Sequence, residues 1–185
     1  MTKIGLYFGT FNPIHIGHCV LAQHMLEFTD LEEVWFVVTP HNPHKKKQTL
    51  LEDHQRLHMV HLAVGNHYKL RVSDVEFGLP QPSYTSHTLA HLSEKFPDKT
   101  FHLIMGADNL SSFPKWKNHE TILENHDLYV YPRINADGGA LKAHPKVHLT
   151  QAPIMQIAST HIRKAIKAGK DVSFMLPETV WKYID

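Results

Sequence analysis

The chain has 185 residues, 42% of them hydrophobic and 20% charged, and its formal net charge is +1 with neutral histidines. These values are ordinary for a globular protein and suit one domain, residues 1–185, whose core needs no disulfide. Because the net charge is close to zero, no nucleic-acid partner is expected. The single Cys19 excludes an internal disulfide, and the sequence shows neither a membrane-spanning apolar run nor a signal peptide. We therefore expect a cytoplasmic protein with no membrane partner.

Strand and helix patterns alternate along the whole chain. Strands are expected at residues 3–8, 33–39, 68–77, 100–105, 127–131 and 146–149. Helices are expected at residues 16–29, 52–64, 86–96, 120–125, 160–168 and 178–184. Such alternation is typical of βαβ units and predicts an α/β fold with a doubly wound parallel sheet.

The end of the first strand carries the most informative segment, GTFNPIHIGH at residues 9–18. A helix that starts here offers unpaired backbone N–H groups and a partial positive charge to an anion. Gly9 allows close approach of the backbone, and His15 and His18 share one face of the first helical turn. A plain turn or a metal-binding histidine pair would also fit, although no nearby carboxylate or cysteine completes a metal site. We favour a phosphate-binding turn.

A second segment, IASTHIR at residues 157–163, has the features of another phosphate site. Ser159 is expected to cap the helix, with Thr160 and the free N–H groups facing a ligand. The guanidinium fork of Arg163 suits phosphate oxygens. Taken alone, a capped helix with an early arginine is common, so the assignment depends on its pairing with residues 9–18.

The turn after the fourth strand and the lysine-flanked tryptophan beyond it are candidate ligand contacts. Gly106 could admit a ribose and Asp108 could accept its hydroxyls, although Asp108 would also serve as an ordinary helix cap. If the first and fourth strands are neighbours, this turn and residues 9–18 face one crevice at the carboxyl edge of the sheet. Trp116 offers an indole face for stacking on an aromatic ring.

The segment PSYTSHTL at residues 82–89 begins a helix and has free N–H groups of its own. The simpler interpretation is a capped start, with Thr85 or Ser86 as the cap.

Together these segments resemble the bacterial nicotinate mononucleotide adenylyltransferase family, and the resemblance covers nearly the whole chain. The matching segments are GTFNPIHIGH at 9–18, NPHK at 42–45, PSYTSHTL at 82–89, GADNLSSFPKWK at 106–117 and STHIR at 159–163. The first and last are shared with the wider nucleotidyltransferase superfamily that carries H-x-G-H, whereas PSYT and PKWK point to the nicotinate branch. Asn12 stands where many members have aspartate.

The resemblance implies a Rossmann-like nucleotidyltransferase fold with a small C-terminal helical segment. It also implies transfer of AMP from ATP to nicotinate mononucleotide in NAD biosynthesis, giving nicotinate adenine dinucleotide and pyrophosphate. The implied catalytic residues are His15, His18 and Arg163. The implied ATP-binding residues are Gly9, Thr10, Phe11, Gly17, Gly106, Asp108, Ile157, Ser159 and Thr160. The implied nicotinate mononucleotide-binding residues are Asn12, Lys45, Ser83, Tyr84, Thr85, Trp116, Lys117 and Arg133. Mg²⁺ is implied together with ATP, held mainly by substrate phosphates and not by a protein metal site.

Several other functions remain open at this point. They are an amide-preferring nicotinamide mononucleotide adenylyltransferase, a phosphopantetheine adenylyltransferase, a nucleotide-binding sensor without turnover, and a metal-binding protein that uses some of the 17 histidines. The sequence also leaves open the oligomeric state, a homo-oligomer included.

Overall fold

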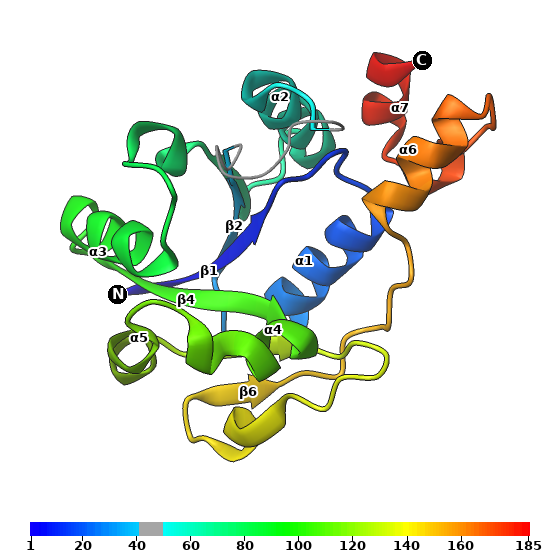
Figure 1. The fold of residues 1–185 in the computed structure, drawn as a ribbon. Helices are drawn as coiled ribbons and strands as arrows, with labels where there is room; N and C mark the ends of the chain where they lie inside the picture. Colours follow the sequence, from blue (N-terminus) through cyan, green and yellow to red (C-terminus); the bar gives the residue numbers. More distant parts are fainter. Residues whose placement is uncertain (41–49) are drawn as a thin grey trace.

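A single six-stranded sheet forms the centre of the computed structural model, which describes residues 1–40 and 50–185. The strand order is β3-β2-β1-β4-β5-β6, and all neighbouring strands are parallel (Figure 1). The strands are β1 (Thr2–Gly9), β2 (Glu33–Val38), β3 (Leu70–Ser73), β4 (Lys99–Gly106), β5 (Leu128–Tyr131) and β6 (Val147–Leu149). The predicted doubly wound parallel fold is confirmed.

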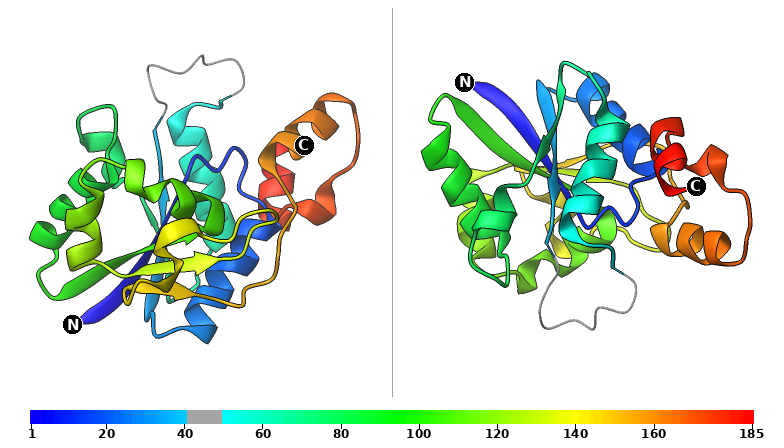
Figure 2. Two further views of the ribbon diagram at one scale, coloured as in Figure 1. Left: turned by 60° about the horizontal axis from the view of Figure 1, so that its bottom comes forward. Right: turned by 90° about the horizontal axis from the view of Figure 1, so that it is seen from above.

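Helices cover both faces of this sheet (Figure 2). The α-helices are α1 (Ile16–Phe28), α2 (Asp53–Val64), α3 (Thr85–Lys95), α4 (Ala107–Ser112), α5 (His119–Asn125), α6 (Ser159–Lys167) and α7 (Glu178–Ile184). Short 3-10 helices lie at η1 (Val75–Gly78), η2 (Phe113–Lys115), η3 (Gly139–Ala143) and η4 (Ser173–Met175).

Alternating side chains of the strands supply two separate cores, one on each face. In β1, Tyr7 joins the core formed with α1, α2, α6 and α7, whereas Leu6 joins the core formed with α3, α4 and α5. Because successive residues of a strand point to opposite faces, a strand buried on both sides reads as a continuous apolar run. The sequence VWFVV in β2 follows this rule.

The winding of the chain places the ends of β1 and β4 side by side. β1 pairs with β2 on one side and with β4 on the other, so the direction of winding reverses between β1 and β4. In parallel sheets, ligands bind outside the carboxyl ends of strands at such a reversal. The condition named in the sequence analysis, that the first and fourth strands are neighbours, is therefore met.

Two element predictions are wrong. The strand expected at 68–77 is only Leu70–Ser73, followed by η1. Ser73 pairs with Val37, one residue before β2 ends at Val38, so β2 leaves almost no length for a longer edge strand to pair with. Helix α4 replaces the simple turn expected after β4. The other predicted boundaries agree within one residue. Across the described ranges, none of the helices is both long and apolar enough to cross a membrane.

Candidate active site

Helix α6 starts against the turn that follows β1, although the two segments are far apart in sequence. The hydroxyl of Ser159 donates to the carbonyl oxygen of Pro13 at 2.9 Å, and Nη1 of Arg163 donates to the carbonyl oxygen of Asn12 at 2.8 Å. Figure 1 shows the start of α6 beside the start of α1. The two segments predicted to bind phosphate therefore meet, as the sequence analysis expected.

Ser159 reaches Pro13 because it does not cap its helix, which corrects the prediction. The N-cap of α6 is Ala158, and Ser159 is the first helical residue. The caps expected for α3 are also wrong: Tyr84 occupies the N-cap position and makes no side-chain capping bond. In both helices the first N–H groups are left without a side-chain cap, so they can donate to a ligand.

His15 and His18 form a reciprocal cap at the start of α1. The backbone N–H of His15 donates to Nδ1 of His18 at 3.1 Å, and that of His18 donates to Nδ1 of His15 at 3.4 Å. Their rings stack with centroids 3.7 Å apart and planes 20° apart. Because each Nδ1 accepts a hydrogen bond, the proton of each neutral ring lies on Nε2.

Burial keeps both histidines neutral. It lowers the pKa of His15 to about 4. It also lowers the pKa of His18 well below 6.5, with further contributions from the charge that His15 would carry if protonated and from the charge of Arg133. At neutral pH the pair thus offers two Nε2–H donors and no basic nitrogen that could accept a proton.

Two glycines leave room for the aromatic rings around the histidine pair. A Cβ atom on Gly17 would lie 2.9 Å from Cε1 of His15, and one on Gly9 would lie 2.9 Å from Cζ of Phe11. The Phe11 ring is buried and makes an edge contact with His18, with centroids 5.1 Å apart. Gly9 therefore leaves room for Phe11, a reason that the sequence analysis did not foresee.

A Gly17→Ala substitution is expected to displace the His15 ring and lower kcat about tenfold, because misplaced donors stabilise the transition state poorly. Helix propensity favours alanine, so the melting temperature should change little. Steady-state kinetics with a thermal melt would check this. Unchanged kcat in the variant would contradict the stated role of Gly17.

The stacked histidines line a cavity of about 270 Å³, here called the histidine cavity. Opposite them, Nε of Arg133 lies 3.8 Å from Oδ1 of Asp108. The predicted site residues that line this cavity are His15, Gly17, His18, Asp108, Arg133, Ile157 and Ser159. The cavity thus combines neutral donors, one cation and one carboxylate. Arg133, expected on the mononucleotide side, lies with the residues assigned to ATP.

Gly106 ends β4 beneath this group. A Cβ there would lie 3.0 Å from both Cγ of Arg133 and Cε2 of Tyr131, so a larger residue would push the cavity wall inward. Asp108 lies in the first turn of α4 and does not cap it, since the N-cap is Gly106.

Residues assigned to the mononucleotide gather at a second place. Nζ of Lys117 lies 4.3 Å from the centre of the Tyr84 ring. This contact joins the turn after η2 to the start of α3. Intrahelical bonds of α3 begin at His87, which donates to the Tyr84 carbonyl, so the N–H of Thr85 precedes them. Trp116 is half-buried against Phe113. This cluster presents backbone donors, an indole and an ammonium group.

The remaining predicted residues lie in different settings. The Thr160 hydroxyl accepts from Nη2 of Arg163 at 3.3 Å, and the Ser83 hydroxyl donates to Oε1 of Gln81 at 3.1 Å. The carbonyl of Thr10 accepts from a buried arginine, Arg56. Lys45, within the NPHK segment, lies outside the described residues.

The cavity residues that were not among the predicted site residues are Tyr7, Leu21, Asn109, Tyr131, Met155 and Ala158. Tyr7 and Tyr131 sit on β1 and β5, and their rings make an edge contact with centroids 6.1 Å apart. Their apolar strand context gave no signal of a polar role. Within residues 1–40 and 50–185, no group of three or more histidine, cysteine, aspartate or glutamate side chains could hold a metal ion.

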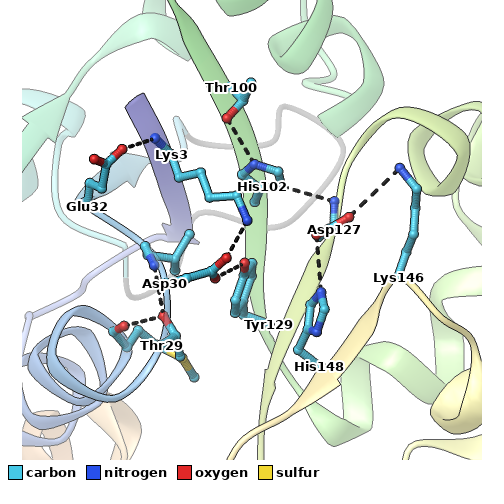
Figure 3. Close-up of polar contacts among 12 residues, drawn as sticks. Lys3, Thr29, Asp30, Glu32, Thr100, His102, Asp127, Tyr129, Lys146 and His148 are labelled. Atoms are coloured by element: carbon cyan, nitrogen blue, oxygen red, sulfur yellow. Dashed lines mark hydrogen bonds and ion pairs between the residues drawn. The ribbon is translucent and has the colours of Figure 1, made fainter. Parts of the chain in front are cut away.

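A second polar cluster lies at the opposite, amino-terminal edge of the sheet (Figure 3). Nδ1 of His102 accepts from the backbone N–H of Asp127 at 3.1 Å, and Oδ2 of Asp127 accepts from Nε2 of His148 at 3.1 Å. Lys3 pairs with Asp30, which also accepts from the hydroxyl of Tyr129. Burial lowers the pKa of His102 from 6.5 to about 4.

The low pKa of His102 predicts that the folded protein loses stability in acid. The unfolded chain protonates His102 near pH 6.5, whereas the folded protein does so only near pH 4, so stability falls as pH is lowered between these values. His102→Asn should remove about 2 kcal/mol of the difference in unfolding free energy between pH 7 and pH 5. Urea unfolding at both pH values would measure it, with exposed His161→Asn as control. An unchanged pH dependence in His102→Asn would refute the effect.

The fold and the site together define a class of protein. A doubly wound sheet with neutral imidazole donors and a guanidinium at two converging helix starts is suited to binding a polyphosphate and stabilising charge as it is transferred. These features are those of a nucleotidyltransferase.

Comparisons with known proteins agree. The cytidylyltransferase-like family model matches residues 6–165. A protein of Flavobacterium johnsoniae named "Probable nicotinate-nucleotide adenylyltransferase" is 60% identical over 185 residues, covering 99% of this chain and 96% of that protein. One of the same name from Bacteroides thetaiotaomicron is 42% identical, covering 98% and 90%. This chain therefore belongs to the nicotinate-nucleotide adenylyltransferase family.

A solved structure shares the fold. The nicotinic acid mononucleotide adenylyltransferase of Plasmodium falciparum, determined in complexes with APC and with NaAD, matches with a TM-score of 0.79 at 22% identity. The match covers 100% of this chain and 95% of that chain.

Proposed function

We infer that this chain is an enzyme that transfers AMP from ATP to nicotinate mononucleotide, giving nicotinate adenine dinucleotide and pyrophosphate in NAD biosynthesis. Relatives with this name cover nearly the whole chain at up to 60% identity. The structural observation that carries the proposal is the meeting of Arg163 and Ser159 with the turn that leads to the stacked histidines.

The reaction needs alignment and charge stabilisation more than proton transfer. A phosphate oxygen of the mononucleotide attacks the α-phosphorus of ATP in line, and the bond from this phosphorus to the bridging oxygen of the β-phosphate breaks. The nucleophile is already anionic, so no general base is required. Neutral His15 and His18, with Nε2–H donors, suit this role because they stabilise developing charge without exchanging a proton.

The start of α6 is assigned to the leaving group. Arg163 and the first N–H groups of the helix would hold the β- and γ-phosphates and then the pyrophosphate, assisted by Ser159 and Thr160. Gly106 and Asp108, across the histidine cavity, would contact the adenosine.

The cluster of Tyr84, Lys117 and Trp116 is assigned to the mononucleotide. Trp116 would stack on the pyridine ring, and the N–H groups of Thr85 and Lys117 would bind its carboxylate. A site made of donors alone favours the acid over the amide, because an amide NH₂ brings hydrogens toward hydrogens. Arg133 would attract the mononucleotide phosphate from the wall of the histidine cavity.

Mg²⁺ fits this site as an ion held mainly by the substrate. The histidine cavity supplies one carboxylate, Asp108, and that carboxylate is paired with Arg133. Mg²⁺ prefers six oxygen ligands and keeps several waters. Phosphate oxygens of the substrate and water molecules would therefore be most of its ligands. Bound there, it would neutralise charge on the phosphates.

Incubation of the protein with ATP, Mg²⁺ and either nicotinate or nicotinamide mononucleotide, with detection of pyrophosphate and the dinucleotide, tests the proposal. Rapid turnover of the acid form is expected. Preference for the amide would establish the alternative specificity, and no turnover of either compound would reject the proposed activity.

A further inference from the structure

Six polar or charged residues are buried among the described residues, and four of them lie outside the candidate active site. The six are Asn12, His15, Arg56, Glu76, Thr88 and His102. Arg56, Glu76 and Thr88 are joined through one half-buried residue, Thr39, at the carboxyl end of β2. Buried charges are costly to desolvate. A connected set of buried polar groups therefore suggests a role other than stabilising the fold.

Arg56 joins the candidate phosphate-binding turn at residues 9–18, here called the phosphate turn, to the end of β2. Its side chain is fully buried on α2, and its Nη1 donates both to the carbonyl oxygen of Thr10 at 2.6 Å and to that of Thr39 at 2.8 Å. Its Nε donates to the carbonyl oxygen of Leu51 at 3.0 Å, and Asp53 pairs with the guanidinium from the surface. One rigid, planar group thus fixes three backbone carbonyls relative to each other.

Glu76 continues the connection from Thr39 to the start of α3. Oε1 of Glu76 accepts from the hydroxyl of Thr88 at 2.8 Å, whereas the buried Oε2 has no hydrogen-bond partner. The side chain of Thr39 interacts with this carboxylate and opposes the rise in its pKa that burial causes. The Thr88 hydroxyl also lies 3.4 Å from the carbonyl oxygen of Tyr84. The chain of contacts therefore runs from Thr10, in the phosphate turn, to the N-cap of the helix assigned to the mononucleotide.

We propose that Arg56 and Glu76 are positioning residues that act through Thr39 to set the spacing between the ATP-phosphate turn and the mononucleotide-binding start of α3. The inference rests on the proposed function, since it concerns the alignment of those two substrates.

The proposed reaction requires accurate alignment of its two substrates, which such a network can provide. In-line attack requires the two phosphates to meet within a narrow geometry, and an error of about 1 Å can cost on the order of a hundredfold in rate. Buried polar groups held by several hydrogen bonds, as Arg56 is, specify one arrangement more strictly than apolar packing does.

The test uses variants that break single links in the full-length protein. Thr39→Val removes the hydroxyl but keeps the shape, and Glu76→Leu removes both carboxylate contacts. Each is expected to lower kcat about tenfold with KM for ATP changed less than about twofold, because the contacts of ATP are untouched. Burial raises the pKa of Glu76, so neutral Glu76→Gln, which keeps an acceptor for Thr88, should retain most of the activity.

Two further measurements separate positioning from a merely structural role. The effects of Thr39→Val and Glu76→Leu on kcat should not multiply in the double variant, since both break the same link. Activity of Arg56→Ala should rise when guanidinium ion at non-denaturing concentration refills the buried site. Arg71→Ala, which loses only the ion pair with Glu33 at the sheet edge, should show neither the loss nor the rescue.

The outcomes are distinct. Lower melting temperatures with unchanged kcat in Thr39→Val and Glu76→Leu would overturn the inference, as would multiplicative effects in the double variant. Failure of the proposed function would appear differently, as a wild-type protein that forms no dinucleotide from either mononucleotide.

Discussion

His18→Ala is expected to lower kcat at least about a hundredfold, because loss of one preorganised donor to a developing charge typically costs on the order of 10² to 10³ in turnover. His18 is half-buried beside His15 and carries its proton on Nε2, so it can donate to the α-phosphate as charge builds. KM for both substrates should change much less than kcat, since the donor acts mainly in the transition state.

The same substitution removes a helix cap, which needs a matched control. His18 Nδ1 accepts from the backbone N–H of His15, so alanine should also cost about 1 kcal/mol of stability. His18→Asn offers an acceptor at a similar position but no Nε2–H, and should keep stability while losing activity. Turnover close to wild type in His18→Asn would defeat the assignment of His18 as the donor.

Arg163→Ala is expected to lower kcat/KM for ATP about a hundredfold or more. The guanidinium is assigned to the β- and γ-phosphates, where its charge and fork geometry matter both in binding and in release of pyrophosphate. Its Nη1 also donates to the carbonyl of Asn12, so alanine would loosen the contact between α6 and the phosphate turn. Steady-state kinetics at varied ATP concentration would measure both effects.

Two variants distinguish charge from geometry at this position. Arg163→Lys keeps the charge but cannot form two parallel bonds, so it should recover only part of the loss. Lys164→Ala removes a neighbouring exposed charge from the same helix and should leave kcat/KM unchanged. Equal losses in Lys164→Ala and Arg163→Ala would mean that Arg163 contributes only to a general positive field.

Local patterns were sufficient for the order of elements and for singling out residues 9–18 as a candidate phosphate-binding turn. A strand buried on both faces reads as an unbroken apolar run, as in VWFVV, and a histidine pair three residues apart must share a helix face. The prediction failed where long-range contacts decided the outcome. The neighbouring strand β2 ends one residue beyond the partner of Ser73, and Ser159 reaches across to Pro13 and does not cap its own helix.

The sequence by itself determined the α/β class, the parallel winding, and which residues could bind phosphate, because these follow from periodicity and from chemistry within one turn of helix or strand. Only the tertiary structure decided that His15 and His18 stack as neutral donors, that Arg133 faces them, and that Arg56 and Glu76 meet at Thr39. Protonation, burial and long-range contacts depend on which distant segments pack together, and no local pattern encodes that.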